Sequence, residues 1–225
     1  MSAALGWGAL AASSLVIGAL IALARPWPDV AVGLVLAFGA GALISAVSFD
    51  LAEEGVQLAG ATAVGIGLAA GGLTYFLADR ALPKGDEGAA LTLGAFLDGI
   101  PEQLVLGIGL AAGDGVSVGL LAAIFVSNLP EAIGSASGLH APPRKVMALW
   151  VAVAAICTLA TVAGFALADN VSDEFQGAAN GFAAGALLVM LIDSMIPEAV
   201  RKGGDVSGLV TVLGFAVAAG LSSVS

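Results

Sequence analysis

The stretch Ala95-Phe-Leu-Asp-Gly-Ile-Pro-Glu-Gln-Leu-Val-Leu-Gly107 places two carboxylates and a proline inside an otherwise apolar segment. Asp98 and Glu102 stand four residues apart, and Pro101 directly precedes the glutamate. Residues at i and i+4 share one face of a helix, so the two carboxylates are predicted to lie side by side. A proline inside a helix also frees the carbonyl four residues earlier. The stretch therefore predicts a kinked helix that carries a small patch of oxygen atoms.

The same pattern returns twenty-nine residues later in Ile124-Phe-Val-Ser-Asn-Leu-Pro-Glu-Ala132. Pro130 and Glu131 repeat the proline–glutamate pair, Ser127 stands where the first copy has its aspartate, and Asn128 follows it. A charge inside a bilayer costs at least ~2.5–3.5 kcal/mol on insertion scales, so a carboxylate that occurs twice in one context indicates a function. We predict a cation site between two kinked helices. The structural alternative is a tolerated kink whose carboxylate only caps a neighbouring helix.

The composition places these segments in a membrane. Of the 225 residues, 59% are hydrophobic and 11% are charged, and the mean hydropathy is +1.04, which excludes an ordinary soluble domain. The net charge of −10 argues against nucleic acid or anionic lipid as a partner, and it fits either a cation substrate or a salt-adapted source organism. Because His140 and Cys157 are the only histidine and cysteine, an imidazole-based metal cluster and an internal disulfide are excluded.

The apolar runs predict an all-α polytopic membrane protein with eight spans in one domain, residues 1–225. About 20 apolar residues are needed for each span. The predicted spans cover residues 4–24, 30–52, 58–78, 89–112, 116–139, 146–168, 177–196 and 206–222. We interpret the first as a span and not as a cleaved signal, because no basic residue precedes it. Short polar segments separate the spans, of which residues 79–87 are the longest and residues 169–174 are acidic.

The basic residues predict the orientation. All seven fall in alternate loops, which contain Arg25, Arg80, Lys84, Arg144, Lys145, Arg201 and Lys202. By the positive-inside rule these four loops are cytoplasmic and both termini lie outside. This distribution supports an even number of spans independently of hydropathy. We expect a multi-pass protein of the cell (inner) membrane.

The sequence also contains an internal repeat. Phe38-Gly-Ala-Gly-Ala-Leu43 in the second span resembles Phe182-Ala-Ala-Gly-Ala-Leu187 in the seventh, and in that register Glu54 corresponds to Glu198. These two spans cross in opposite directions, so spans 1–3 and 6–8 are predicted to be inverted repeats around spans 4 and 5, a 3+2+3 arrangement. Such repeats are typical of secondary transporters with a site near the midplane. Chance similarity between glycine- and alanine-rich helices is the alternative explanation.

Further acids mark a predicted path through the membrane. At a rise of about 1.5 Å per residue, Glu102 and Glu131 lie near its middle on adjacent antiparallel helices. Weaker candidates lie at the outer end of span 2 and in the inner part of span 7, because acids at helix ends are usually only solvated. These weaker candidates are Asp50, Glu53, Glu54, Asp193 and Glu198.

The motifs Asp98-Gly-Ile-Pro-Glu-Gln103 and Ser127-Asn-Leu-Pro-Glu-Ala132, on spans 4 and 5, resemble those of the ZIP (Zrt/Irt-like) metal transporter family, especially its short prokaryotic members. In the seventh span Gly185-Ala-Leu-Leu188 and Ile196-Pro-Glu-Ala199 are also similar to that family. The resemblance covers nearly the whole chain. It implies eight spans arranged 3+2+3, both termini outside, and a two-metal centre built on motifs of the type H-N-x-P-E-G.

The resemblance implies the metal ligands residue by residue. Glu102 and Glu131 match the family's bridging glutamates, and Asn128 matches a ligand of the second metal position. Asp98 and Ser127 occupy ligand positions that often hold histidine. In this chain a glycine replaces the usual asparagine of the first motif, span 6 carries no acid, and the His-rich loop between spans 3 and 4 is absent. One divergent, histidine-poor site is therefore expected.

The ligand types bear on the choice of metal. An all-oxygen set suits harder ions, whereas imidazole and thiolate favour zinc. We expect the chain to move divalent cations of the zinc, iron or manganese class towards the cytoplasm, with the metal as substrate, no cofactor and no enzymatic activity. The lipid bilayer is its expected surrounding, nucleic acid is not expected as a partner, and a homodimer is left open.

Three other functions compete with metal transport. An intramembrane enzyme is disfavoured, because the chain has no H-E-x-x-H or G-x-S-x-G motif and no second histidine. A non-transporting homologue that acts as a sensor or scaffold stays open, because the first motif has lost its histidine. A carrier of another solute, with Glu102 and Glu131 as proton carriers, also stays open, because membrane carboxylates serve in proton relays.

Overall fold

The computed structural model describes residues 1–82, 87–112 and 118–223, and within these ranges every regular element is helical. The predicted all-helical class is therefore confirmed. The predicted turn at residues 113–115 lies outside the described residues, as does the middle of the polar segment at residues 79–87. In chain order the elements are α1 (Ser2–Ala24), α2 (Asp29–Ser45), the π-helix η1 (Ala46–Glu53), α3 (Glu54–Asp79), α4 (Glu87–Ala112), α5 (Val118–Gly138), α6 (Pro143–Leu167), the 3-10 turn η2 (Ala168–Asn170), α7 (Asp173–Met190), the π-helix η3 (Leu191–Met195), α8 (Ile196–Gly203), the 3-10 turn η4 (Gly204–Val206) and α9 (Ser207–Ser222).

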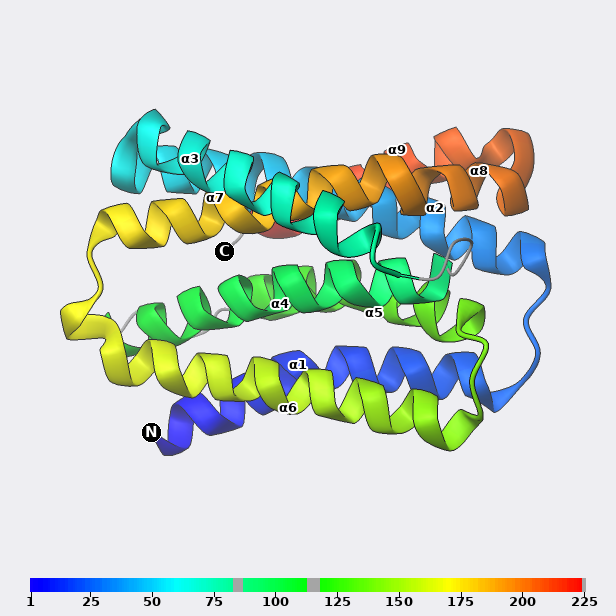
Figure 1. The fold of residues 1–225 in the computed structure, drawn as a ribbon, viewed down its shortest axis with the longest axis horizontal. Helices are drawn as coiled ribbons and strands as arrows, with labels where there is room; N and C mark the ends of the chain where they lie inside the picture. Colours follow the sequence, from blue (N-terminus) through cyan, green and yellow to red (C-terminus); the bar gives the residue numbers. More distant parts are fainter. Residues whose placement is uncertain (83–86, 113–117, 224–225) are drawn as a thin grey trace.

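The helices run lengthwise in three layers (Figure 1). One outer layer contains α1 and α6, the middle layer contains α4 and α5, and the other outer layer contains α2, α3, α7, α8 and α9. The packing follows these layers, since α1 contacts α5 and α6, α4 contacts α6 and α7, and α5 contacts α2. The two helices that carry the proline–glutamate motifs are therefore covered on both sides.

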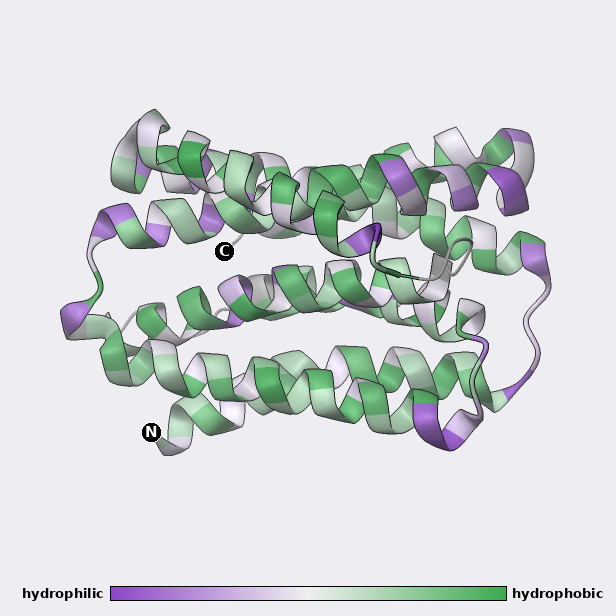
Figure 2. Ribbon diagram, viewed as in Figure 1, coloured by the Kyte–Doolittle hydropathy of each residue, from purple (hydrophilic) through white to green (hydrophobic). Residues whose placement is uncertain are grey.

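The surface along the helices is largely apolar, and polar residues concentrate at their ends (Figure 2). Large apolar side chains are strongly exposed, among them Leu209 at 75%, Ile66 at 66% and Leu159 at 62%. Such a surface is favourable in lipid and unfavourable in water. Among the described residues, five helical runs are long and apolar enough to cross a membrane: Ser2–Ala24, Asp29–Asp79, Gly88–Ala111, Pro143–Leu167 and Asp173–Ser222. The chain is a multi-pass membrane protein.

Two of these runs are too long for a single crossing. Asp29–Asp79 has 51 residues and Asp173–Ser222 has 50. At ~1.5 Å per residue each would reach about 75 Å as a straight helix, against a hydrocarbon core of about 30 Å. Each run contains one glycine with a positive φ, Gly60 at 80° and Gly204 at 71°, a conformation that glycine adopts without strain. The chain reverses near these glycines, so each run is a helical hairpin (Figure 1).

The two hairpins share landmarks at a constant sequence offset. Gly60 and Gly204 are 144 residues apart, and so are Phe38 and Phe182, which begin the repeated Phe-x-Ala-Gly-Ala-Leu motif. A π-helix follows the motif in both hairpins, η1 in the first and η3 in the second. The contacts between the two hairpins correspond as well, because α3 packs on α7 and α9 packs on α2. The last helix of each hairpin thus packs on the first helix of the other.

Glycines allow these helix pairs to approach closely. A Cβ atom at Gly185 of α7 would overlap the backbone of Leu68 on α3, and one at Gly41 of α2 would overlap the backbone of Thr211 on α9. Gly41 and Gly185 are also 144 residues apart. Lipid provides no hydrophobic drive for helices to associate, so close backbone packing supplies much of the attraction.

One end of the bundle carries the described basic residues, and we call it the basic end. The connections α1–α2, α5–α6 and α8–α9 and the end of α3 lie towards this end, on the right in Figure 1, whereas the N-terminus lies at the opposite end. Arg25 stacks on Trp27 here, and Arg80 stacks on Phe76. The residues that define the basic end are Arg25, Arg80, Arg144, Lys145, Arg201 and Lys202.

The start of the seventh predicted span differs from the structure. The seventh predicted span starts at residue 177, but α7 starts at Asp173, because the Ser172 hydroxyl accepts a hydrogen bond from the Phe175 amide and caps the helix. Asp173 and Glu174 therefore lie in the first turn, where acids interact favourably with the helix dipole. The acidic segment predicted as a loop thus supplies the start of a helix.

Candidate cation site

The first motif lines a cavity of about 230 Å³ between the middle layer and the α2–α7 layer. Asp98 and Glu102 come from α4, Ser127 comes from α5, and Asp50 and Glu54 come from η1 and the start of α3. Small and apolar residues make up the rest of the described lining, apart from one asparagine on α7. The sequence-predicted residues of α4 thus share one cavity with two acids from a distant part of the chain.

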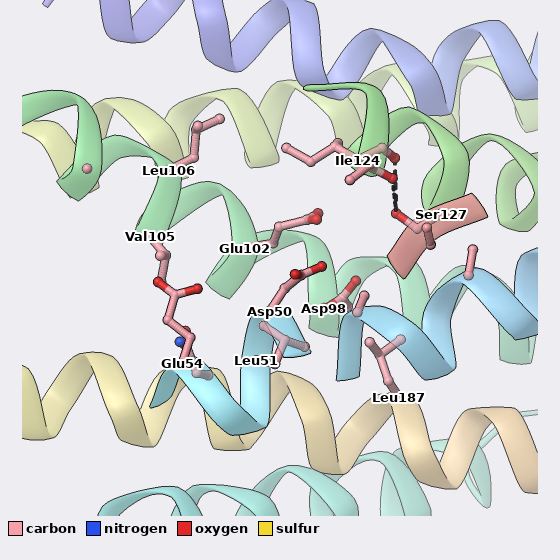
Figure 3. A pocket seen from close by; sticks show the side chains of 16 residues that line it. Asp50, Leu51, Glu54, Asp98, Glu102, Val105, Leu106, Ile124, Ser127 and Leu187 are labelled. Carbon is pink, nitrogen blue, oxygen red and sulfur yellow. Dashed lines mark hydrogen bonds between the residues drawn. The ribbon is translucent and has the colours of Figure 1, made fainter. Parts of the chain in front are cut away.

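The cavity lies between two walls that both carry carboxylates. Figure 3 shows Asp50, Asp98 and Glu102 pointing towards the same part of the cavity from opposite sides. The lining continues to Gly109 and Ala218, which lie late in α4 and α9, away from the basic end. No basic residue is among the described lining residues. The acids therefore create a negative potential that attracts cations towards the middle of the helices.

Side chains of α5 complete the inner part of the site. The Asn128 amide donates a hydrogen bond to Oε2 of Glu102 at 3.5 Å. The Ser127 hydroxyl donates to the Ile124 carbonyl at 3.1 Å, so the lone pairs of its oxygen stay available to a ligand. Asp98, Ser127 and Asn128 are buried, and Glu102 is half-buried. The structure therefore brings four of the five predicted metal ligands together.

The fifth predicted ligand, Glu131, is not among the described residues that line the cavity. Its side chain is 0% exposed, and neither carboxylate oxygen has a hydrogen-bond partner among the described residues. Gly94 of α4 faces it, because a Cβ atom built at Gly94 would lie 3.4 Å from Oε1 of Glu131 and 2.7 Å from Cγ of Met190. A buried carboxylate without a partner is costly, so this group requires either a cation or a proton.

Within the described ranges, no three residues among histidine, cysteine, aspartate and glutamate lie close enough together to hold a metal ion. The α4 motif offers two carboxylates, and α5 adds a hydroxyl and an amide oxygen. This donor set consists of oxygen atoms only, which suits hard divalent cations. The predicted two-glutamate site is therefore separated in the structure into an open part at Glu102 and a closed part at Glu131.

The weaker candidates of the predicted path fall into distinct environments. Asp50 and Glu54 line the cavity, and the Ser222 hydroxyl donates to Oδ2 of Asp50 at 3.2 Å. Glu53 is exposed and accepts a hydrogen bond from the Gln57 amide at 3.2 Å, and it is not among the residues that line the cavity. Asp193, on η3, is exposed as well and does not line the cavity.

Glu198 lies in a second pocket at the basic end, which has a volume of about 330 Å³ and is also lined by His140. Its carboxylate is buried and forms ion pairs with Lys202, at 2.8 Å, and with Arg201. Two cations of the chain thus already neutralise this acid. The repeat relates Glu198 to Glu54, but of the two only Glu54 lines the cavity.

Sequence reasoning missed two residues of this region. Asn180 of α7 lines the cavity and is 2% exposed. The only sequence feature that could have pointed to it is its polar side chain within a run of small residues. Cys157 of α6 is fully buried, and a Cβ atom at Gly99 would lie 2.9 Å from its Sγ. Sulfur thus occupies the space that a longer side chain at position 99 would take. Only the packing of α4 on α6 reveals this contact.

Comparison with known proteins gives one informative similarity. No protein-family model matches the chain. The chain is 31% identical, over 189 residues, to a protein of Arabidopsis thaliana named "Putative zinc transporter". The match covers 76% of this chain and 30% of the length of that relative. Most of this chain is therefore similar to a limited part of a larger protein.

Proposed function

We propose that the chain is a transporter that moves divalent metal cations of the zinc, iron or manganese class towards the cytoplasm, through the carboxylate-lined site between α4 and α5. The observation that carries this proposal is the cavity, which runs from the end opposite the basic end to the middle of α4. Its charged described lining residues are all acids, and acids at membrane depth mark ion pathways. The similarity to the Arabidopsis protein supports the same class of substrate.

The proposed topology is eight crossings in a 3+2+3 arrangement within a single transmembrane domain of the short prokaryotic ZIP type. The hairpins that reverse near Gly60 and Gly204 each supply two crossings, and their shared landmarks support an inverted repeat around α4 and α5. The basic end would face the cytoplasm, with both termini outside the cell (inner) membrane. A cation entering the cavity then starts from the outside.

Cysteine labelling tests this topology. In a Cys157→Ala background, single cysteines at Arg144 and at Lys202 should react with a membrane-impermeant maleimide only from the cytoplasmic side. A cysteine at Ser2 should react only from the outside. Labelling of one position from both sides, or of Ser2 from the cytoplasm, would contradict the eight-span orientation.

We propose an order of ligands along the path. Asp98 and Glu102 receive the ion in the cavity, with oxygen atoms from Ser127 and Asn128. Glu131 follows as the deeper ligand, because it lies one turn further along α5 towards the basic end. An ion that reaches Glu131 would neutralise a carboxylate that lacks any described partner, which favours inward movement.

Uptake into proteoliposomes tests the proposed function. Purified protein should carry Zn²⁺, Fe²⁺ and Mn²⁺ with a flat preference, since oxygen ligands lack the imidazole that favours zinc. Glu102→Gln should abolish most of this uptake. A protein that moves none of the three ions would contradict the proposal.

The buried, unpartnered carboxylate of Glu131 favours a second candidate, a carrier of another solute that uses glutamates as proton carriers. Proton flux distinguishes the two functions. A carrier of this kind would acidify the vesicle interior in the absence of divalent metal, and Glu131→Gln would stop that acidification. The metal transporter should show no such metal-independent flux.

A further inference from the structure

We propose that the cavity contains a second cation position, formed by Asp50, Glu54 and Asn180 on the wall opposite the α4 motif. This inference rests on the proposed function, because it assigns a second stage to the same path. The three residues come from η1, from the start of α3 and from α7, so they belong to the outer layer of the bundle, whereas Asp98 and Glu102 belong to the middle layer.

The decisive residue is Asn180. It lines the cavity, it is 2% exposed, and its Oδ1 atom has no hydrogen-bond partner among the described residues. A buried polar atom without a partner is energetically costly. Amide carbonyl oxygens are good ligands for hard divalent cations, and a cation in the cavity would satisfy this atom.

Local packing holds Asn180 beside the acids. Gly55 directly follows Glu54, and a Cβ atom at Gly55 would lie 3.2 Å from Cβ of Asn180 and 2.9 Å from a methyl group of Val64. Position 55 is buried, so a larger residue there would displace α7 from the start of α3. The glycine therefore allows the amide to lie against the chain segment that carries Glu54.

The π-helix explains why Asp50 and Glu54 face the same cavity while Glu53 does not. A π-helix takes more residues per turn than an α-helix. Residues four apart, such as Asp50 and Glu54, therefore come closer to sharing one face of the helix. Residues three apart, such as Asp50 and Glu53, are turned further away from each other. Asp50 and Glu54 accordingly line the cavity, although Glu54 is also partly open to the surface, whereas Glu53 is not among the lining residues and bonds to Gln57.

The negative charges of the carboxylates on this wall also favour a bound cation. Asp50 interacts electrostatically with Glu54 and with Glu102, and all three carry the same charge when ionised. One oxygen of Asp50 accepts a hydrogen bond from Ser222, which leaves the other oxygen for a ligand. A divalent ion between Asp50, Glu54 and Asn180 would replace repulsion with attraction. The ion would then pass across the cavity to Asp98 and Glu102.

Binding stoichiometry of Mn²⁺ tests the second position. The full chain in detergent, titrated with Mn²⁺ and followed by the electron paramagnetic resonance signal of the free ion, should bind two ions per chain. Asp50→Asn and Asn180→Leu should each lose one of the two ions. Glu53→Gln is the matched control, because its side chain lies outside the cavity, and it should keep both ions. Leucine is a conservative choice at position 180, since Leu36 stands at the corresponding position 144 residues earlier on α2.

Asn180→Asp keeps the test decisive if the leucine variant does not fold, because aspartate retains an oxygen ligand and should keep both ions. Equal stoichiometry in wild type, Asp50→Asn and Asn180→Leu would overturn the second position.

Failure of the proposed function is a separate outcome. Normal uptake by Glu102→Gln would refute the transport site, whereas the loss of one Mn²⁺ in Asn180→Leu would still support the second position.

Discussion

The α4 and α5 motifs have the same proline–glutamate pair at the same spacing but differ in their surroundings. Glu102 is half-buried in an open cavity, and its carboxylate accepts a hydrogen bond from Asn128. Glu131 is sealed between α4 and α7 and lacks a described partner for either oxygen. Two local sequences that look equivalent thus hold carboxylates that differ in exposure and in hydrogen bonding.

The difference comes from the layers that each motif faces. The α4 carboxylates face η1 and the start of α3, where space remains between the layers. Glu131 faces Gly94 and Met190, which fill the space around it. The middle layer thus carries one accessible and one closed carboxylate, as a path with successive sites requires.

The largest expected effect is the loss of uptake in glutamate variants. Glu102→Gln and Glu131→Gln should each lower the initial rate of Mn²⁺ uptake at least ~10-fold, equivalent to about 1.4 kcal/mol. The double variant should be little worse than either single one, because both residues serve one path and their effects are not additive. Glu53→Gln is the control and should lower uptake only partly. Near-normal uptake by Glu131→Gln at a normal protein level would remove Glu131 from the path and leave only the α4 motif.

The second effect is a difference in protein stability between the Glu131→Gln and Glu102→Gln variants. Glu131→Gln should raise the free energy of unfolding by ~1–3 kcal/mol, because it removes a buried, unpartnered carboxylate. Glu102→Gln should change it less, since Glu102 is only half-buried and has a hydrogen-bond donor. Denaturation of both variants in metal-free detergent measures the difference. An equal change in both would show that the two environments do not differ energetically.

A third effect concerns the metal. Asp98→His adds an imidazole to the open cavity and should shift the preference for Zn²⁺ over Mn²⁺ several-fold, about 1 kcal/mol. Competition uptake with both ions in one vesicle preparation measures the ratio. If wild type already carries Zn²⁺ and excludes Mn²⁺ and Fe²⁺, the argument from ligand type is wrong.

The smallest effect tests the contact between the motifs. Asn128→Leu removes the amide that donates to Glu102 and should weaken Mn²⁺ binding by ~0.5–1.5 kcal/mol, the usual contribution of one hydrogen bond. Asn128→Asp replaces the donor with another oxygen ligand, and binding should recover at least in part. Unchanged Mn²⁺ affinity in the leucine variant would show that α4 binds the ion without help from α5.

The sequence predicted much of this arrangement. Hydropathy alone indicated the helices, and it divided each of the two long helical runs into two predicted spans, which agrees with the reversals near Gly60 and Gly204. The spacing of Asp98 and Glu102 correctly placed both carboxylates on one face of a helix, and that face lines the cavity. These features were predictable because they depend on composition and helical period, which act over a few neighbouring residues.

Tertiary structure alone decided which of these residues share a cavity. A regular α-helix would have put Asp50, Glu53 and Glu54 on one face, but in the π-helix η1 Glu53 is turned away from the cavity that Asp50 and Glu54 line. Packing closed Glu131 away and placed Asn180, whose buried Oδ1 has no described hydrogen-bond partner, in the wall of the cavity. The reason is physical: the helical period fixes which face of its own helix a residue occupies, whereas the space in front of that face is set by helices that are distant in the chain.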